Sequence, residues 1–191
     1  MFTSHEKMQS EVQIPDGVTV TKKKHMLGFT GPLGKTFKSF RSIQVGIEIS
    51  DGKILLKAAG PRKRDYATLH TARSIIRNIC EGLTTGYTVK MKVIFAHFPV
   101  TVKVVDGTIR IENFQGERAA RTARIVGSTT RVTPKGEDVI VTGAVWTDVT
   151  QTAANIELAT KIKDKDHRVF LDGIYVYEKS KGIDDADGRG K

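Results

Sequence analysis

The sequence predicts an α+β protein with two tandem, duplicated domains, each a small, mainly antiparallel β-sheet with one packed α-helix. Short apolar stretches that alternate with polar residues, joined by glycine-containing turns, indicate strands. Two longer stretches, at about 65–81 and 148–163, have apolar residues at helical spacing. The same order of motifs occurs in both halves, which predicts an N-terminal domain at 1–86, a C-terminal domain at 87–180 and a flexible tail at 181–191.

The first domain is expected to contain strands and then its helix. The strands are expected at about 14–21, 25–30, 36–40, 43–49 and 53–58. Asp51-Gly52 joins the last two, and Asp-Gly between apolar strands is a strong hairpin signal. The apolar face of the helix consists of Leu69, Ala72, Ile76 and Ile79. Asp65 is the expected N-cap and Gly82 the expected C-terminal stop.

The second domain repeats this plan. The segment at 98–102 resembles the start of the first domain, Asp106-Gly107 marks a hairpin, and 134–141 matches 50–56. The turn at 113–118 takes the place of the glycine-rich turn from Gly31 to Lys35. The apolar face of the second helix consists of Val149, Ala153, Ile156 and Ala159. Residues 86–95 are expected to close the first sheet and lead into the second.

The C-terminal region alternates around an Asp-Gly turn. Val169-Phe170-Leu171 and Ile174-Tyr175-Val176 flank Asp172-Gly173, which predicts a strand pair around a tight turn. In this interpretation Phe170, Ile174 and Val176 belong to the core, and Asp172 and Gly173 shape the turn. An arginine and an aspartate poised for catalysis are the less favoured alternative.

Charge and composition favour a polyanionic partner. The 191 residues contain 31 Lys+Arg and 21 Asp+Glu, which gives a net charge of +10 and a pI near 9.7. A hydrophobic content of 39% is enough for a folded core, and only 7% aromatic residues favours contact with folded RNA or DNA through phosphates. We see no transmembrane span or secretory signal, and the single Cys80 cannot form an internal disulfide. These features favour a reducing cytosolic compartment and no membrane partner.

Gly34-Lys35-Thr36 ends as a phosphate-binding P-loop does, but the spacing is wrong. The motif G-x-x-x-x-G-K-[ST] needs a glycine at position 29, which is Phe29. Pro32 has no N–H to offer a phosphate, and residues 43–49 alternate as a strand does. The sequence therefore predicts a tight turn with Lys35 at its tip. A nucleotide-binding enzyme that uses Lys35 and Thr36 is a disfavoured alternative.

No catalytic or metal site is expected, and no cofactor. The histidines are scattered and form no zinc spacing: His5, His25, His70, His97 and His167. The acidic residues near the C-terminus resemble the start of an EF-hand. Ile183 stands where that loop needs its first aspartate, and the chain ends before the closing glutamate.

Basic clusters are the remaining candidates for function. They are Lys22-Lys23-Lys24, then Arg62-Lys63-Arg64 before the first helix, and Arg118, Arg121 and Arg124 at every third residue. One such cluster alone is as often a solvated surface run. Three clusters on a chain of +10 favour contact with phosphates, which position a protein without reading sequence.

Four motifs resemble one known family. The ending "DHRVFLDGIYVYEK", at 166–179, resembles the C-terminal signature of the universal large-subunit ribosomal protein family that is numbered six in bacteria and nine in eukaryotes. The motifs "NFQGERAAR", "IPDGVTV" and "GPLGK" also look like that family, so the resemblance covers nearly the whole chain. The version here looks like the eukaryotic (60S) type.

The resemblance implies a structural, non-enzymatic constituent of the large subunit with two copies of one α+β domain. It implies binding to large-subunit rRNA near the sarcin–ricin loop and the stalk base, beside neighbouring ribosomal proteins and the docking site of translation-factor GTPases. It implies ribosomes in the cytoplasm, with transit through the nucleolus during assembly. By carry-over, the residues expected to meet RNA are Gly31, Gly34, Lys35, Asn113, Gly116, Arg118, Arg121, Arg168 and Lys179. A free-standing RNA-binding regulator is the alternative from another class.

Overall fold

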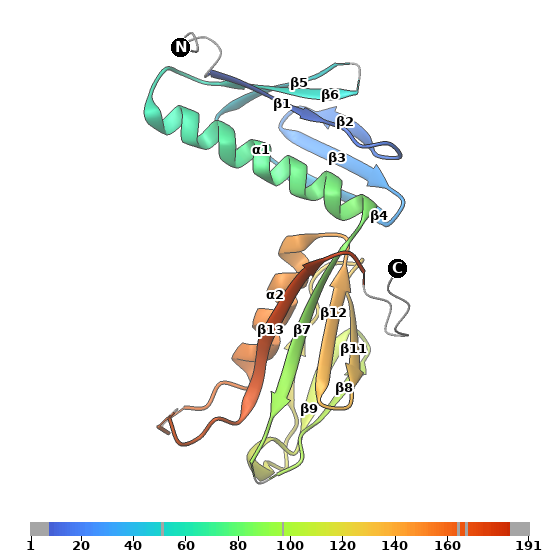
Figure 1. The fold of residues 1–191 in the computed structure, drawn as a ribbon, viewed down its shortest axis with the longest axis vertical. Helices are drawn as coiled ribbons and strands as arrows, with labels where there is room; N and C mark the ends of the chain where they lie inside the picture. Colours follow the sequence, from blue (N-terminus) through green and yellow to red (C-terminus); the bar gives the residue numbers. More distant parts are fainter. Residues whose placement is uncertain (1–7, 51, 97, 164, 167, 184–191) are drawn as a thin grey trace. The chain divides into compact units, whose positions relative to one another are not determined.

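The chain folds into two units, each with strands followed by a helix (Figure 1). The computed structural model describes residues 8–50, 52–96, 98–163, 165–166 and 168–183. Unit 1 is Met1–Thr84 and unit 2 is Thr85–Lys191. Asp51 of the expected hairpin, three of the histidines (His5, His97 and His167) and residues 184–191 of the expected tail lie outside the described residues.

Unit 1 contains two antiparallel sheets and a long helix. Its elements are β1 (Gln9–Gln13), β2 (Thr19–Lys23), β3 (Met26–Gly31), β4 (Gly34–Ser39), β5 (Val45–Ser50), β6 (Lys53–Ala58) and α1 (Lys63–Thr84). One sheet has the order β1-β6-β5, and the other is the meander β2-β3-β4. Helix α1 contacts β1, β3, β5 and β6, so both sheets share it as a cover.

Unit 2 contains the same parts and an added strand. Its elements are β7 (Tyr87–Ile94), β8 (Thr101–Val105), β9 (Thr108–Glu112), the short 3₁₀ turn η2 (Phe114–Gly116), β10 (Arg121–Arg124), β11 (Arg131–Lys135), β12 (Asp138–Gly143), α2 (Trp146–Ala159) and β13 (Gly173–Lys181). One sheet has the order β11-β12-β7-β13, and the meander has the order β10-β9-β8.

The strand pairings show the duplication directly. The antiparallel pairs β1–β6 and β5–β6 of unit 1 correspond to β7–β12 and β11–β12 of unit 2. The meander β2-β3-β4 corresponds to β8-β9-β10, and a helix follows the last strand of each set. The expected fold class, a duplicated α+β domain with mainly antiparallel sheets, is confirmed.

Each unit has its own apolar core between helix and sheets. The fully buried side chains of unit 1 include Leu27, Phe29, Ile54, Leu56, Leu69, Ile76 and Leu83. Those of unit 2 include Met91, Ile109, Ile111, Phe114, Val141, Val149 and Ile156. Burial of each such side chain contributes about 1.5–3 kcal/mol. The expected apolar faces of both helices therefore do face the cores.

The ends of α1 differ from the expected ones. The helix begins at Lys63, and Asp65 in its first turn accepts a 3.2 Å hydrogen bond from the backbone N–H of Arg62. Asp65 thus acts from the third helical position, as the acidic partner of a capping box does, and is not the N-cap. Gly82 is buried inside the helix, which continues to Thr84. Gly86, with a φ of +76°, adopts the left-handed conformation just beyond.

Helix α2 begins at Trp146 and ends at Ala159, so it both starts and ends earlier than the expected range of about 148–163. The Thr160 hydroxyl donates to the Ile156 carbonyl and accepts the Ile174 N–H at 3.1 Å. Thr160 therefore ends the helix and attaches the start of β13 to it.

Several strand predictions were wrong. β1 was missed because only Val12 of its residues is buried, which leaves no alternation to detect. The strand expected at 14–21 begins at Thr19, after a turn closed by a hydrogen bond from the Val18 N–H to the Pro15 carbonyl. Within the segment 86–95, Tyr87–Ile94 forms β7, a central strand of the sheet β11-β12-β7-β13 in unit 2, so the segment does not close the first sheet.

The strand pair expected around Asp172-Gly173 is half present. Gly173–Lys181 forms β13, whereas Val169–Leu171 forms no strand. Ile174 is fully buried, and Phe170 and Val176 pack against the core, as expected. The Asp172 carboxylate is buried and accepts the Ala96 N–H at 3.0 Å, so it connects this loop to the end of β7.

Candidate nucleic-acid interface

The first basic cluster lies at one end of the unit 1 meander. Lys22 and Lys23 are the last residues of β2, and Lys24 is the turn residue with a φ of +53°. The expected strands at 14–21 and 25–30 would have placed all three lysines between strands, and the structure corrects this for Lys22 and Lys23. All three lysines are exposed, and the ammonium of Lys22 donates to the Ile47 carbonyl of β5 at 2.5 Å.

The glycine-rich turn lies at the other end of the meander and packs on α1. A Cβ atom on Gly31 would lie 2.8 Å from the Cβ of Leu83, and the Leu33 N–H donates to the Leu83 carbonyl at 3.2 Å. Gly31 therefore permits a close approach of turn and helix within the protein. Gly34 has a φ of +139°, which favours glycine.

Lys35 is exposed in β4, one residue beyond the turn, and does not form its tip. Gly34, Lys35 and Thr36 belong to a strand that follows a two-residue turn. A P-loop requires these residues at the N-terminus of a helix, so the structure excludes that geometry.

The second basic cluster surrounds the N-terminus of α1. Arg62, Lys63 and Arg64 are all exposed there. Cations at the positive end of a helix dipole repel that end, so their presence favours an anionic partner. The Asp65 carboxylate partly offsets this potential through its bond to Arg62.

The turn at 113–118 is shaped by two of the expected contact residues. Asn113 has a φ of +59°, and its side-chain amide donates to the Pro99 carbonyl at 3.1 Å. Gly116 has a φ of +76°, and a Cβ atom there would lie 3.2 Å from the Phe98 ring. Both residues support the loop conformation, which positions the exposed Arg118.

The three arginines spaced by three residues do not share a face. Arg121 and Arg124 are the first and last residues of β10, and residues three apart in a strand point to opposite sides. Arg121 lies on the inner side, with a quarter of its side chain exposed, and Arg124 is exposed on the outer side. The regular spacing in the sequence therefore corresponds to no common face of the strand.

Arg121 is held by a network inside unit 2. Its guanidinium donates to both carboxylate oxygens of Glu117, at 2.9 and 2.5 Å, and to the carbonyls of Ala159, the last residue of α2, and of Lys161 just beyond it. It also lies 4.4 Å from the centroid of the Phe114 ring. The hydrogen bond from Arg121 is the main reason that the pKa of Glu117 falls below its usual range.

Two further cations on the outer face of the unit 2 meander were missed. Lys103 of β8 lies opposite Arg110 of β9, and Arg124 is in the same layer of strands. Arg110 is exposed between the buried Ile109 and Ile111. That alternation, Ile-Arg-Ile, is the sequence signal for an outward cation, although a single arginine forms no visible cluster. Lys103 is also within 2.6 Å of the Glu112 carboxylate.

The C-terminal candidates are separate from these. The guanidinium of Arg168 is 91% exposed and forms a local ion pair with the carboxylate of Asp166, at 2.9 Å, which raises the pKa of Arg168. Lys179 is exposed on β13, beyond the register shift between Val176 and Glu178.

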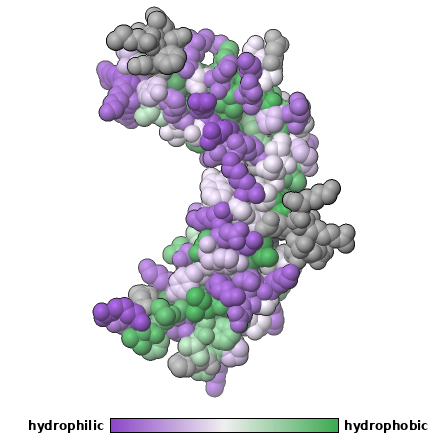
Figure 2. All heavy atoms as spheres, viewed as in Figure 1, coloured by the Kyte–Doolittle hydropathy of each residue, from purple (hydrophilic) through white to green (hydrophobic). Residues whose placement is uncertain are grey.

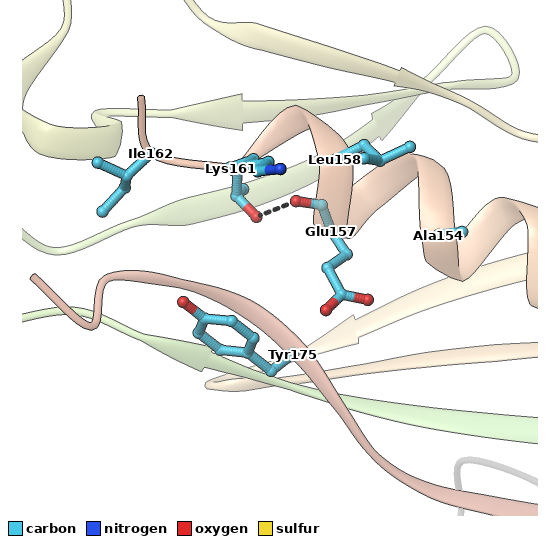
Figure 3. Close-up of a pocket in the computed structure, with 7 residues that line it drawn as sticks. Ala154, Glu157, Leu158, Lys161, Ile162 and Tyr175 are labelled. Carbon is cyan, nitrogen blue, oxygen red and sulfur yellow. Dashed lines mark hydrogen bonds between the residues drawn. The ribbon is translucent and has the colours of Figure 1, made fainter. Parts of the chain in front are cut away.

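An apolar cavity of about 440 Å³ lies between the end of α2 and β13 (Figure 3). Its lining consists of Ala154, Glu157, Leu158, Thr160, Lys161, Ile162 and Tyr175. The dashed line in Figure 3 is the 3.1 Å hydrogen bond from the Thr160 hydroxyl to the Glu157 carbonyl. Its lining includes neither histidine, cysteine nor aspartate, and the Thr160 hydroxyl donates to a backbone carbonyl and not to a side-chain base.

Apolar side chains are also exposed at this end of unit 2. Leu158, Val169 and Leu171 are more than half exposed, and Figure 2 shows apolar residues gathered near the connection from α2 to β13.

Among the described residues, no group of His, Cys, Asp and Glu could hold a metal ion. No helix in the described ranges is both long and apolar enough to span a membrane.

A duplicated α+β fold with a high positive charge and cations on two outer sheet faces is typical of a nucleic-acid-associated structural protein. Comparison with known proteins makes this specific. The family model described as "Ribosomal protein L6" matches residues 98–173. Proteins described as "Large ribosomal subunit protein uL6" are similar over most of the chain. The one from Methanobrevibacter smithii is 42% identical over 90% of this chain and 96% of its own length. Those from Staphylothermus marinus and Methanosphaera stadtmanae are 43% and 44% identical, each over 88% of this chain and 92% and 91% of their own lengths.

The chain therefore belongs to the uL6 family of large-subunit ribosomal proteins. It is a structural constituent of the large ribosomal subunit, takes part in translation and is not an enzyme. Large-subunit rRNA and other ribosomal components are its partners. The family expected from the C-terminal signature is confirmed, and the archaeal relatives agree with the class that includes the eukaryotic type.

Proposed function

We propose that this chain binds large-subunit rRNA near the sarcin–ricin loop and the stalk base, and so supports the region where translation-factor GTPases dock. Neighbouring ribosomal proteins of the stalk base complete its surroundings. The proposed contacts are the exposed cations Lys23, Lys24, Lys35, Arg62, Lys63, Arg64, Arg118, Arg124, Arg168 and Lys179. Lys22, Gly31, Gly34, Asn113, Gly116 and Arg121 shape or support the surfaces that carry them.

The observation that carries this proposal is a basic outer face on each meander. In unit 1 the face has Lys23 at one end and Lys35 at the other. In unit 2 it has Lys103, Arg110 and Arg124. The opposite face of each meander is buried against the core, so these cations face solvent, where a partner outside the unit can reach them; Lys103 also pairs with Glu112 of the same face. Phosphate contacts of this kind supply affinity and orientation.

We further propose that the subunit is of the 60S type, that the protein is in cytoplasmic ribosomes, and that it passes through the nucleolus during assembly. The eukaryotic character of its motifs supports this. Fluorescent tagging during ribosome synthesis tests it: nucleolar signal that precedes cytoplasmic signal agrees with the proposal, and signal that never enters the nucleolus contradicts it.

Binding to a large-subunit rRNA fragment that contains the sarcin–ricin loop tests the contacts. The wild-type affinity should fall steeply with salt, and Arg118→Ala and Arg124→Ala should each lower the log–log salt slope by about 1. Lys57→Ala is a matched control, since Lys57 forms a 3.1 Å ion pair with Glu48 on the other sheet of unit 1. Affinity no higher than for an unrelated RNA, or equal effects in all three variants, would contradict the proposed interface.

A free-standing RNA-binding regulator was the alternative from the sequence, and membership of the uL6 family disfavours it. Sedimentation of the tagged protein from a lysate, at low and high salt and with ribonuclease, separates the two. A large-subunit constituent sediments with the subunit through moderate salt and is released by RNA digestion. A regulator stays at the top of the gradient.

A further inference from the structure

Phe37 is an exposed aromatic residue on the outer face of the unit 1 meander. Its side chain is 74% exposed, the highest value among the large apolar side chains of the described residues. It lies in β4, opposite Gly28 of β3, which in turn lies opposite Thr21 of β2. An exposed aromatic ring on a rigid strand costs free energy in water, so a partner that covers it is favoured.

Gly28 leaves the surface beside the Phe37 ring without a protruding side chain. A Cβ atom on Gly28 would lie 2.9 Å from the Thr21 hydroxyl oxygen, so only glycine fits there without a shift. At the equivalent place in unit 2, Arg110 lies between Lys103 and Thr122. The duplication thus has a cation at the centre of one meander, and at the centre of the other a glycine beside an aromatic ring.

The charge around Phe37 indicates what covers it. Lys35 lies two residues before Phe37 on the same side of β4, about 7 Å along the strand. Lys23 is on the same face at the far end of β2, where it lies opposite Met26 and, beyond it, Ser39. Between Thr19 and Ser39 the sequence has five lysines and neither aspartate nor glutamate. A polyanion with flat, apolar groups matches this surface.

We propose that Phe37 is a stacking platform for one unpaired base of large-subunit rRNA, with Lys23 and Lys35 on the flanking phosphates. The proposal rests on the proposed function and adds a base contact to its phosphate contacts. Every base has a π-face, so the contact can form with any of the four bases. It requires a base that is unpaired and unstacked from the RNA helix.

A tryptophan at this position reports stacking directly. Trp146 is the single tryptophan of the chain and lies in unit 2, so the experiment uses Phe37→Trp in a Trp146→Phe background. Addition of the sarcin–ricin-loop fragment should quench its fluorescence while the affinity stays close to wild type. Quenching that is absent at saturating RNA would overturn the proposal.

Substitutions then separate stacking from simple apolar contact. Phe37→Ala should weaken RNA binding about 5- to 100-fold, and Phe37→Leu nearly as much, because leucine retains apolar area without a π-face. Leu158→Ala, which removes an exposed apolar side chain from α2, should leave affinity unchanged. Wild-type affinity in Phe37→Leu would overturn the proposal.

Two further outcomes are distinguishable. If Phe37→Ala lowers co-sedimentation with large subunits but leaves RNA affinity unchanged, a neighbouring protein covers the ring and the stacking proposal is wrong. If the wild-type protein shows no specific affinity for the RNA fragment, both the proposed function and the stacking proposal are wrong. Normal affinity with unchanged binding by Phe37→Ala contradicts stacking alone.

Discussion

The guanidinium of Arg121 donates hydrogen bonds to both carboxylate oxygens of Glu117, four residues earlier in the chain, at 2.9 and 2.5 Å. The same guanidinium lies over the Phe114 ring and donates to the carbonyls of Ala159 and Lys161 at the end of α2. It therefore connects the loop, the core and the end of the helix. Arg121, which the sequence predicts to be an RNA contact, is thus held by contacts within unit 2, whereas Arg118 and Arg124 are exposed.

Replacement of Arg121 should destabilise unit 2. Arg121→Ala removes charge-assisted hydrogen bonds and the contact with Phe114, so we expect a loss of about 1–3 kcal/mol in the free energy of unfolding. Urea unfolding followed by Trp146 fluorescence measures it, since Trp146 packs 5.1 Å from the Tyr87 ring in the same unit. Arg118→Ala is the matched control, with a change below about 0.5 kcal/mol. Equal losses in both variants would refute the supporting role of Arg121.

The Glu117 carboxylate should make this stability depend on pH. Its folded pKa is lowered by the hydrogen bond from Arg121, so the ionised form stabilises the fold above the ordinary value of 4.5. That contribution is lost as the pH falls from 4.5 through the lower folded pKa. Because the side chain is 39% exposed, we expect less than about 1 kcal/mol. The difference in unfolding free energy between wild type and Glu117→Gln should shrink towards acid pH, and a difference that is constant with pH would contradict this account.

Gly31 should tolerate no side chain. In Gly31→Ala the new methyl group meets the Cβ and the carbonyl of Leu83, at 2.8 and 3.2 Å, and neither atom can turn away. We expect a loss of about 1–3 kcal/mol in the stability of unit 1. Gly46→Ala is the control, because its Cβ would be 3.5 Å from that of Lys57, an ordinary contact. Thermal unfolding followed by circular dichroism compares them, and a Gly31→Ala variant as stable as Gly46→Ala would show that the turn does not pack closely on α1.

Cys80 should be unreactive until unit 1 unfolds. Burial, and secondarily the charge of Glu81, raises the pKa of its thiol from 9.0 to about 11, so thiolate at neutral pH is about 100-fold scarcer than for an ordinary cysteine. Its side chain is also 1% exposed. An aromatic disulfide reagent should therefore react at least ~100-fold more slowly with native than with urea-unfolded protein. Comparable rates in the two states would mean that α1 opens readily.

The sequence predicted the fold best where apolar spacing was regular. Both helices and the hairpin β5–β6 followed from it, because apolar residues recur at regular spacing in these elements. β1 was missed, since only Val12 is buried on that strand. The end of α1 was misplaced at Gly82, which tertiary packing keeps inside the helix. Local sequence patterns fail to predict an element, or its end, where contacts with a neighbouring element stabilise it.

The candidate interface was predictable as charge but not as geometry. Runs such as Lys22–Lys24 are visible in sequence, yet which ammonium donates to Ile47 depends on a strand that comes later in the chain. Arg110 and Phe37 each lie among residues of other types in the sequence, so neither belongs to a visible cluster. Their positions follow only from the strand registers, which place Arg110 at the centre of one meander and Phe37 beside the central Gly28 of the other.

Hydroxyl-radical footprinting of rRNA in large subunits tests the central claim most directly. Subunits assembled with and without this protein should differ in cleavage at the sarcin–ricin loop and the stalk base, and the double variant Arg118→Ala/Arg124→Ala should lose part of that protection. Protection confined to other parts of the rRNA, or unchanged in the double variant, would contradict the proposed interface.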